Sequence, residues 1–383
     1  KAVTVGENGE RIYPKTECYG ILIAYVDDIL CTGVSEHVQQ IKDLLFKQYT
    51  MKVSGHVKSR YDPESEPLKF LGTAIWRGID GVIRLSQEDY AMHCLRENNL
   101  LNISTKTTLP RVLEKIDVEE RDTKNYEMVK SLCQKFIGQL LWMVTRTRPD
   151  IAPSVGDNAS NLVLCPTTVA EQLKHVFAYV RGTMTSALRT LAPVEEEEIK
   201  LELHVYSDAS YNQGGGRGRT GVAIYLCRVD TGEESMIQWV SKKQGMTATS
   251  APEAELAALA EAASIGMYMN EVLMTAGVVE NKTPEVNFII DTDSQVAMQQ
   301  IMNGMAVTVR SKPFMNKLAY LRDCLGLSNE QTEEKQIPLF RLRFLPGTAQ
   351  KADGFTKVLT GEALTNARRN MGVDLVALPR GSA

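Results

Sequence analysis

The stretch LELHVYSD, residues 201–208, alternates apolar with polar side chains and ends on an aspartate. An extended chain places successive side chains on opposite faces, so this period of two predicts a half-buried strand. Continuing the alternation puts Asp208 on the polar face at the end of that strand. The stretch therefore predicts a sheet in the second half of the chain, with an acidic side chain at its edge.

The residues after Asp208 predict the rest of that sheet. A glycine-rich turn at 214–218 leads to two further strands, and then a helix, a strand, a helix from Ser294, a strand and a closing helix follow. The expected strands cover residues 221–226, 236–240, 286–290 and 339–345. Three strands that precede alternating helices and strands predict a mixed sheet.

Acidic residues mark the edges of these elements. The four that stand at the edge of an expected strand or helix are Asp208, Glu255, Asp293 and Asp353. Carboxylates so far apart in sequence can meet only in a fold, and a divalent metal ion is the usual reason for gathering them. Taken singly, Asp293 also suits a helix N-cap, and Asp353 suits a helix start on the surface. The set predicts a site for phosphate chemistry.

Two glutamates compete for one place in that set. Glu253 and Glu255 project about 200° apart around a helix, so they cannot have the same role. Ser250 and Glu253 have the spacing of a capping box, and Pro252 suits the first turn of the helix. We therefore assign Glu253 to capping and Glu255 to metal binding. Periodicity alone leaves the choice open, because both glutamates flank the apolar face of the helix.

A second acidic pair lies near the amino end. The apolar runs 18–25 and 29–33 predict a hairpin with Asp27 and Asp28 at its tip. Adjacent aspartates on a tight turn repel each other unless a cation offsets their charge, so the tip is a candidate second metal site. A solvated turn that merely favours aspartate explains the pair equally well. A helix with Ser35 as its N-cap is expected to pack beside the hairpin.

Other segments predict the frame of the first half. A strand at 69–76 should pair with 81–85 across a turn, and a helix should cover 171–183, where His175 is assigned to packing or to the surface. The acidic run at 193–198 offers no cluster of apolar residues to bury and predicts a solvated linker. We place the domain boundary there.

Composition limits the class of protein. A length of 383 residues suggests two or three domains, and 43% hydrophobic with 23% charged residues describes a soluble globular protein. The longest apolar stretch, near 21–26, is too short for a bilayer, and the chain start lacks a signal-peptide pattern. Seven cysteines without a Cys-x-x-Cys pair are expected to be reduced core thiols in an intracellular protein, and structural zinc is not expected. A net charge of −4 neither proves nor excludes a nucleic-acid substrate.

Several short motifs, taken in order, resemble one family. They are YVDD at 25–28, FLG at 70–72, LSQ at 85–87, TRPDI at 147–151, TDSQ at 292–295, AD at 352–353 and TK at 356–357. From about residue 20 to about residue 370 the chain is similar to the Pol polyprotein of copia-type long-terminal-repeat retrotransposons. The similar part is the rear of the reverse transcriptase together with the ribonuclease H domain.

The resemblance implies a multidomain α+β and α/β protein. A partial reverse-transcriptase palm and a helical thumb would be followed by a ribonuclease H-like mixed-sheet domain. The implied divisions are the palm with its aspartate hairpin and primer grip at 1–85, the thumb and connecting helices at 86–190, an acidic linker at 191–200, the ribonuclease H-like domain at 201–372, and a tail at 373–383.

The resemblance also implies roles for single residues. The ribonuclease H acids, which would hold two Mg²⁺ ions, or Mn²⁺ in their place, are Asp208, Glu255, Asp293 and Asp353. The palm metal ligands would be Asp27 and Asp28, and the primer grip would be Phe70, Leu71 and Gly72. The residue that it implies beside the RNA strand is Gln295. Candidate phosphate contacts, each of which suits a solvated surface charge better when taken singly, are Lys242, Lys243, Arg310 and Lys312, with Arg217 and Arg219 less favoured. The implied partners are an RNA–DNA hybrid and a template-primer.

The chain departs from the family at three points, and from many bacterial and retroviral relatives at a fourth. A third palm carboxylate and the fingers have no counterpart in it, and residues 58–67 form an atypical insert. The loop 346–351 contains no histidine, which is usual for copia-type nucleases and leaves proton transfer to water or to Asp353. We therefore expect that the chain alone does not extend a primer, and that the missing N-terminal part of a polyprotein is a candidate partner.

Three interpretations remain at this point. The first is a reverse transcriptase and ribonuclease H fragment that cuts the RNA strand of hybrids, located in the cytoplasm and in virus-like particles if the element is active. The second is a catalytically silent relic, or a domesticated protein that binds nucleic acid. The third is a cellular ribonuclease H with an unrelated front domain, which the motifs at 27–28 and 70–72 disfavour.

Overall fold

The computed structural model describes most of the chain. The described residues are 4–5, 11–12, 20–57, 66–111, 118–119, 121, 123–194, 199–211, 216–279, 288–304, 312–327 and 337–376. The acidic run at 195–198, most of the insert at 58–67 and Arg310 lie outside these ranges. Within the described part, no helix is both long and apolar enough to cross a membrane.

A five-stranded mixed sheet forms the centre of the second half, in the order β11-β10-β9-β12-β13. Its strands are β9 (Leu201–Ser210), β10 (Arg219–Arg228), β11 (Glu234–Lys243), β12 (Phe288–Thr292) and β13 (Arg341–Phe344). The first three pair antiparallel, whereas β12 runs parallel to β9 and to β13. This is the mixed sheet expected from the sequence, with the first strand in the middle.

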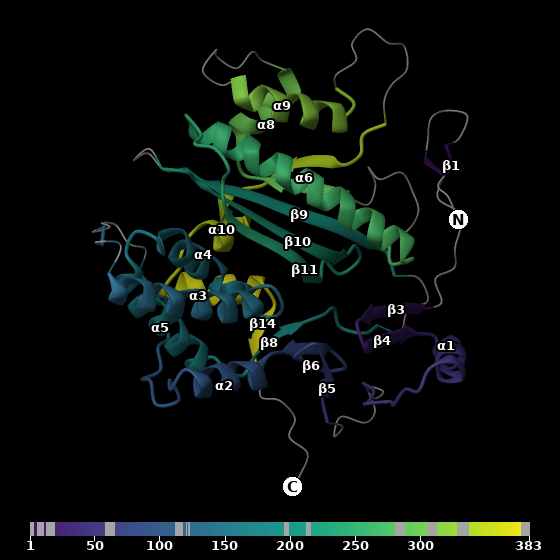
Figure 1. Ribbon diagram of the computed structural model, residues 1–383. Coiled ribbons are helices and arrows are strands. Elements are labelled where there is room, and N and C mark those ends of the chain that lie inside the picture. The colour runs from purple at the N-terminus through teal and green to yellow at the C-terminus, as the bar shows by residue number, and fades with distance from the viewer. Residues whose placement is uncertain are drawn as a thin grey trace.

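Helices cover both faces of this sheet (Figure 1). On one face lies α6 (Ala251–Thr275), with α8 (Gln295–Asn303) and α9 (Lys312–Cys324) beside it. Leu203, Val205 and Leu256 belong to the apolar core between α6 and the sheet. On the other face, Tyr206 and Tyr225 pack into a core that the helices of the first half also share. The prediction that β9 is only half buried is therefore wrong, because a second helical layer covers its polar face.

That second layer is a bundle of helices. Its members are α2 (Glu88–Glu97), α3 (Lys124–Val144), η1 (Pro149–Ile151), α4 (Ala152–Asn161), α5 (Pro166–Gly182), η3 (Gly347–Ala349), α10 (Asp353–Thr356) and α11 (Gly361–Asn370). Trp239 of β11 donates from Nε1 to the Val144 carbonyl at 2.8 Å, and buried Arg219 of β10 forms an ion pair with Asp157 of α4. The central sheet and the bundle therefore share one continuous core across the predicted boundary at 191–200.

The motif at 147–151 is a buried ion-pair centre in this bundle. Arg148 reaches both carboxylate oxygens of Asp150 at 2.9 Å, and the Tyr179 hydroxyl donates to the same carboxylate at 2.9 Å. Arg148 also donates to Thr183, and Arg368 of α11 lies 3.8 Å from Asp150. A buried charge is tolerated when it is paired and hydrogen-bonded in this way. The motif therefore ties η1 to α5 and α11.

A second five-stranded sheet has the order β14-β8-β7-β6-β5. Its strands are β5 (Leu68–Phe70), β6 (Thr73–Arg77), β7 (Ile83–Ser86), β8 (Ser186–Arg189) and β14 (Val373–Leu375). β14 pairs antiparallel with β8, so residues 373–375 are part of a sheet. The prediction that a tail begins at residue 373 is wrong, because these residues supply backbone hydrogen bonds to the edge of β8.

The expected strand at 69–76 is two strands. Leu71 and Gly72 adopt positive φ angles of 49° and 72°, which turn the chain back between β5 and β6. Positive φ is a left-handed conformation that breaks a strand and favours glycine. The segment at 70–72 is thus a tight hairpin turn, and β6 pairs with β7 as expected.

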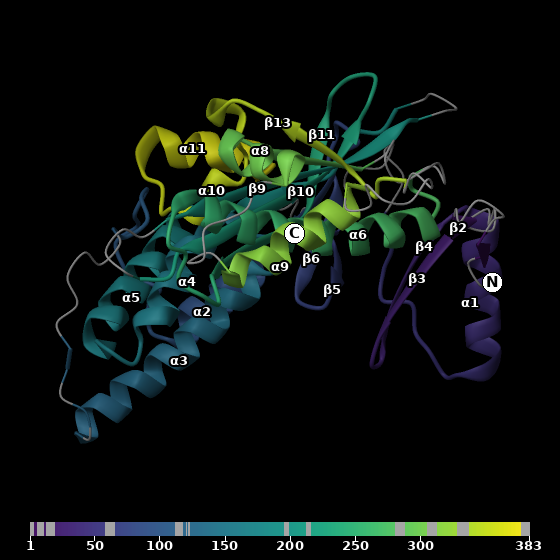
Figure 2. The same ribbon diagram turned by 90° about the horizontal axis from the view of Figure 1, so that it is seen from above.

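The aspartate hairpin forms a separate two-stranded sheet. It consists of β3 (Gly20–Tyr25) and β4 (Asp28–Gly33), followed by α1 (Ser35–Gln48), and both views show it at one end of the molecule (Figures 1 and 2). The N-cap of α1 is Val34, so Ser35 is the first helical residue and not the predicted cap. No residue of α1 is buried, and Val26 at the hairpin tip is 87% exposed. A further small sheet joins β1 (Thr4–Val5) and β2 (Arg11–Ile12).

Candidate active site

The sheet register brings two of the four acids level with each other. Asp291 of β12 is the partner of Tyr206 of β9 in their parallel pairing. Asp208 lies two residues after Tyr206 within β9, and Asp293 lies two residues after Asp291, one residue beyond the end of β12. Neighbouring strands are about 4.8 Å apart, so the two aspartates lie close together near the carboxyl ends of two adjacent strands.

The other two acids come from helices that begin at this edge. Glu255 lies in the first turns of α6, and Asp353 is the first residue of α10. Burial, together with the nearby charges of Asp208 and Asp293, raises the pKa of Glu255 to about 9. A hydrogen bond from the backbone N–H of Ala209 opposes this rise. Burial, and then the Asp353 carboxylate, raise the pKa of Asp208 to about 6, against a hydrogen bond from Thr356. Four elements therefore bring the four acids into one electrostatically coupled group.

Polar groups around the acids hold them in place. The Thr356 hydroxyl donates to Asp208 at 2.5 Å, and Gln350 donates from Nε2 to the Ser207 carbonyl at 2.9 Å and to Asp293 at 3.4 Å. Sequence reasoning missed Gln350, and nothing in its local pattern marks it. Its position is decided by the loop between η3 and α10.

A lysine neutralises part of this negative charge. Lys357 lies 2.7 Å from the Asp353 carboxylate. Burial opposes the charge of the ammonium, but contact with Asp353 and the fields of Asp208 and Asp293 raise its pKa overall. The motif at 356–357 therefore supplies a hydroxyl and a cation to the same group of acids.

Glycine permits the close approach of α10 to the sheet. Gly221 of β10 is the partner of Asp208 in β9. A Cβ atom at this position would lie 2.7 Å from Thr356 Cγ2 and 2.8 Å from the Ala352 carbonyl oxygen. A side chain at residue 221 would push α10 away, and with it the Thr356 hydroxyl and Asp353.

The donor set fits divalent cations that prefer oxygen. One carboxylate oxygen of Glu255 is buried without a hydrogen-bond partner. A buried acceptor without a partner is costly, and a cation beside it would remove that cost. Carboxylate oxygens are the ligands that Mg²⁺ and Mn²⁺ favour over soft donors. Asp208, Glu255, Asp293 and Asp353 would hold such ions.

Glu253 has the separate role that its spacing indicates. It is 3% exposed, and its carboxylate accepts from the backbone N–H and the hydroxyl of Thr249, both at 2.7 Å. Ser250 is the N-cap residue of α6 but makes no capping hydrogen bond through its side chain. Glu253 therefore secures the start of the helix through Thr249, one residue before the predicted partner, while Glu255 faces the other acids.

Known proteins share much of this sequence. The chain is 26% identical over 363 residues to the "Retrovirus-related Pol polyprotein from transposon RE1" of Arabidopsis thaliana, which covers 93% of the chain. It is 27% identical over 294 residues, or 74% of the chain, to the corresponding polyprotein from transposon TNT 1-94 of Nicotiana tabacum. The homologues of the chain are retrovirus-related Pol polyproteins of copia-type plant transposons. The chain spans about a fifth of these relatives, 22% and 20% of their length.

Other comparisons add less. No protein-family model matches the copia-type chain. Over 137 residues, 35% of its length, it is 33% identical to secreted RxLR effector protein 161 of Plasmopara viticola and covers 87% of that protein. Ribonuclease H1 of Halobacterium salinarum matches 43% of the chain and 99% of its own, at 16% identity and a TM-score of 0.25. The ribonuclease H-like assignment of the central sheet rests on its own strand order and directions.

The copia-type aspartate pair is placed differently from the four acids. Asp27 lies in the turn between β3 and β4, Asp28 begins β4, and both are exposed. Among the residues that the structure describes, neither the aspartate pair nor the four acids belong to a group of three ligand atoms that all lie within 4.8 Å of one another. The hairpin and its exposed tip are confirmed, and the metal-binding role of the pair stays a prediction.

The side chains predicted to contact substrate differ in exposure and in ion pairing. Gln295, the first residue of α8, and Lys243 at the end of β11 are exposed, whereas the Lys242 ammonium lies 2.6 Å from Glu261 of α6. Arg219 is buried and forms an ion pair with Asp157 of α4. The prediction that Arg219 contacts phosphate is therefore wrong, because its guanidinium packs against the helical bundle. Arg217 is exposed. Arg310 and the side chain of Lys312 lie outside the described residues.

The primer-grip segment has a defined neighbour. Phe70 ends β5, and the Leu71–Gly72 turn lies beside Trp142 of α3, whose Nε1 is 3.7 Å from the position of a Cβ on Gly72. The Arg146 guanidinium stacks over the Trp142 ring, 4.6 Å from its centroid. An aromatic ring can stack on a base, and a neighbouring guanidinium can contact a phosphate. The primer-grip role of residues 70–72 stays a prediction.

Proposed function

We propose that this copia-type chain is a ribonuclease H that hydrolyses the RNA strand of RNA–DNA hybrids with divalent metal ions. The observation that carries the proposal is the convergence of Asp208, Glu255, Asp293 and Asp353 from four elements, with burial and mutual repulsion raising the pKa of Glu255 and Asp208. Perturbed carboxylates that meet on one edge are typical of functional sites. The proposed cofactor is a pair of Mg²⁺ ions, with Mn²⁺ as a substitute.

Different residues of the chain are proposed to bind the metal ions, orient the ligands and balance their charge. When bound, two divalent cations supply a water of lowered pKa and a positive charge for the leaving oxygen. Asp208 and Asp293 present hard oxygen ligands from the sheet, and Thr356 and Gln350 fix their orientation by hydrogen bonds. Lys357 balances part of the charge of the acids without metal, and its ammonium is proposed to attract an incoming phosphate.

Substrate binding follows from the exposed groups around the site. Gln295 and Lys243 are proposed to contact the hybrid through sugar hydroxyls and phosphates, because a nuclease of this kind must cut many sequences. The template-primer is proposed to run past the segment at 70–72 toward the hairpin. The proposed location is the cytoplasm, with virus-like particles if the element is active.

The test is cleavage of a hybrid. A hybrid with an end-labelled RNA strand, incubated with the 383-residue chain and Mg²⁺, should give short RNA fragments and leave the DNA intact. Asp208→Asn and Asp293→Asn should abolish cleavage while circular dichroism shows an unchanged fold. Cleavage without added divalent metal, or equal cleavage by both variants, would overturn the proposal.

We also propose that the 383 residues alone do not extend a primer. Asp27 and Asp28 are exposed at the tip of a separate two-stranded hairpin, and the third palm carboxylate that the resemblance implies has no counterpart in the sequence. A primer-extension assay on a DNA-primed RNA template should give no added nucleotides. The missing N-terminal part of the polyprotein is the proposed partner that would complete a polymerase site.

A second candidate function is binding of nucleic acid without catalysis, in a relic or a domesticated derivative. The observation in its favour is the likeness to an effector protein that is not named as a polyprotein and shares 137 residues with the chain. A folded wild-type chain that binds a hybrid but leaves it intact with Mg²⁺ and with Mn²⁺ would select this function.

A further inference from the structure

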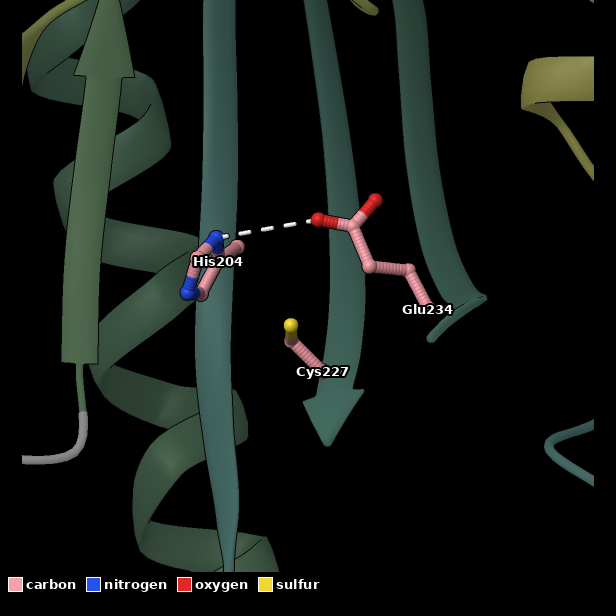
Figure 3. A group of neighbouring side chains, drawn as sticks. All are labelled: His204, Cys227 and Glu234. Carbon is pink, nitrogen blue, oxygen red and sulfur yellow. Dashed lines mark ion pairs between the residues drawn. The ribbon is translucent and has the colours of Figure 1, made fainter. Parts of the chain in front are cut away.

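Three possible metal ligands meet on the same sheet, away from the four acids. His204 of β9, Cys227 of β10 and Glu234 of β11 each offer one ligand atom, and these atoms all lie within 4.8 Å of one another. Cys227 and Glu234 are direct cross-strand partners, and His204 lies diagonally across on β9. Figure 3 shows the three side chains on one side of three adjacent strands, with the thiol facing the gap between imidazole and carboxylate.

The surroundings favour a closed site. His204 is 7% exposed and Cys227 is 6% exposed, and the side chain of Glu234 is 13% exposed. The Tyr206 hydroxyl donates to Glu234 at 3.0 Å, which fixes the direction of the carboxylate. A closed site with ligands held on rigid strands restricts the number and geometry of ligands around a bound ion.

The ligand types identify the class of metal. A cysteine sulfur and an imidazole nitrogen are soft or borderline donors, which Mg²⁺ does not prefer. One histidine, one cysteine and one carboxylate form a set that suits Zn²⁺, with a fourth position for water. We propose that His204, Cys227 and Glu234 bind a zinc-class divalent transition metal ion, separate from the Mg²⁺ site of the proposed nuclease.

The orientation of His204 supports this assignment. Its Nε2 lies 3.3 Å from the Glu202 carboxylate, and its Nδ1 lies 3.8 Å from the Glu234 carboxylate and 3.8 Å from that of Asp291. A metal-binding histidine commonly gives its other ring nitrogen to a carboxylate in this way. The Arg343 guanidinium also reaches Nδ1, at a long 3.4 Å, while its shorter bonds of 2.7 and 3.1 Å go to Asp291.

The ammonium of Lys351 lies beside Glu234, where a bound metal ion would also lie. Its ammonium forms an ion pair with Glu234 and lies over the rings of Tyr206 and Tyr225, 5.1 and 4.8 Å from their centroids. A metal ion at Glu234 must compete with that positive charge. Removing the ammonium should therefore tighten metal binding, which a merely misfolded variant cannot imitate.

No sequence pattern indicates this site. Zinc was not expected because no two cysteines stand in a Cys-x-x-Cys spacing. Here the ligands come from three strands, and only the sheet register places Cys227 opposite Glu234. Spacing rules describe ligands on one loop and do not detect ligands that meet across a sheet.

Cobalt provides the test, because Co²⁺ bound to a thiolate shows a sulfur-to-cobalt charge-transfer band in the near ultraviolet. The reduced full chain, titrated with Co²⁺ alone, should develop this band to one equivalent, and Zn²⁺ should remove it. The four acids carry no sulfur, so a failure of the proposed nuclease leaves this readout untouched. A chain that binds Co²⁺ without a thiolate band would overturn the proposal.

Variants sharpen the test. Cys227→Ser should lose the band, whereas Cys31→Ser, which removes a partly exposed thiol in β4, should keep it. Lys351→Met should bind Co²⁺ about tenfold more tightly, the size typical of changes next to metal ligands. A band that survives Cys227→Ser, or is lost in Cys31→Ser, would contradict the assignment, as would unchanged or weaker affinity in Lys351→Met.

Discussion

The molecule carries aspartates in two contrasting settings. Asp27 and Asp28 are adjacent in sequence and exposed on a hairpin tip, whereas Asp208 and Asp293 are 85 residues apart in sequence and adjacent on the sheet. Only the second pair is joined by further acids, oriented by hydrogen bonds and partly removed from water. Adjacency in sequence leaves the first pair exposed, whereas convergence of separate elements partly buries the second pair beside further acids.

The largest expected effect separates the two settings directly. Asp208→Asn should reduce hybrid cleavage by at least about 1000-fold, because a metal-assisted reaction loses one of its charged ligands. Asp28→Asn should leave the rate within about twofold, because a surface substitution away from the site has little effect. Single-turnover cleavage rates at saturating Mg²⁺ measure both. Comparable losses in the two variants would break the contrast.

A buried aspartate outside the group shows that burial alone is not decisive. Asp150 is 2% exposed, but it is matched by the Arg148 guanidinium and the Tyr179 hydroxyl. Asp150→Asn should destabilise the fold by about 3 to 5 kcal/mol, because it leaves the buried Arg148 charge without a partner. Urea denaturation followed by circular dichroism measures this change. A loss below about 1 kcal/mol would mean that the ion pair contributes little.

Glu255 should behave in the opposite way to Asp150. Its carboxylate is buried among like charges, so Glu255→Gln should stabilise the metal-free protein by about 1 to 3 kcal/mol at neutral pH while abolishing cleavage. The control is Glu261→Gln, which removes a partly buried acid of the same helix that pairs with Lys242 and should change stability by about 0.5 kcal/mol or less. Thermal unfolding in a metal chelator compares the variants, and destabilisation by Glu255→Gln would contradict the expected repulsion.

The smallest expected effect is a gradual pH dependence. The pKa of Glu255 is raised from 4.5 to about 9, so the folded state binds the extra proton between these values. Its contribution to stability is fully present below pH 4.5 and is lost as the pH rises toward about 9. The melting temperature of the metal-free protein, compared with that of Glu255→Gln, should therefore fall more steeply over this range. Parallel profiles for the two proteins would show that Glu255 does not titrate as its burial implies.

Local patterns predicted many elements of this fold. The alternation at 201–208 placed β9 and put Asp208 near its end, and the run before Asp293 placed β12. The spacing of Glu253 and Glu255 separated a capping side chain from one that faces the other acids. These features depend on residues within one or two turns, where the backbone period fixes which side chains share a face.

Features that depend on distant segments were predicted poorly. The polar face of β9 is buried because α3, α4 and α10 pack against the sheet, and nothing in residues 201–208 encodes those neighbours. Arg219 was expected near phosphate, but its partner Asp157 is 62 residues away in the chain. Residues 373–375 were expected in a tail, but the free edge of β8 pairs with them.

The sequence by itself indicated the resemblance to copia-type Pol polyproteins and predicted the strands and helices that carry the four acids. Only the tertiary structure decided which acids are neighbours, that Gly221 admits α10 to the sheet, and that His204, Cys227 and Glu234 meet. The physical reason is that side-chain direction follows from the local backbone period, whereas distances between elements follow from long-range strand pairing and packing.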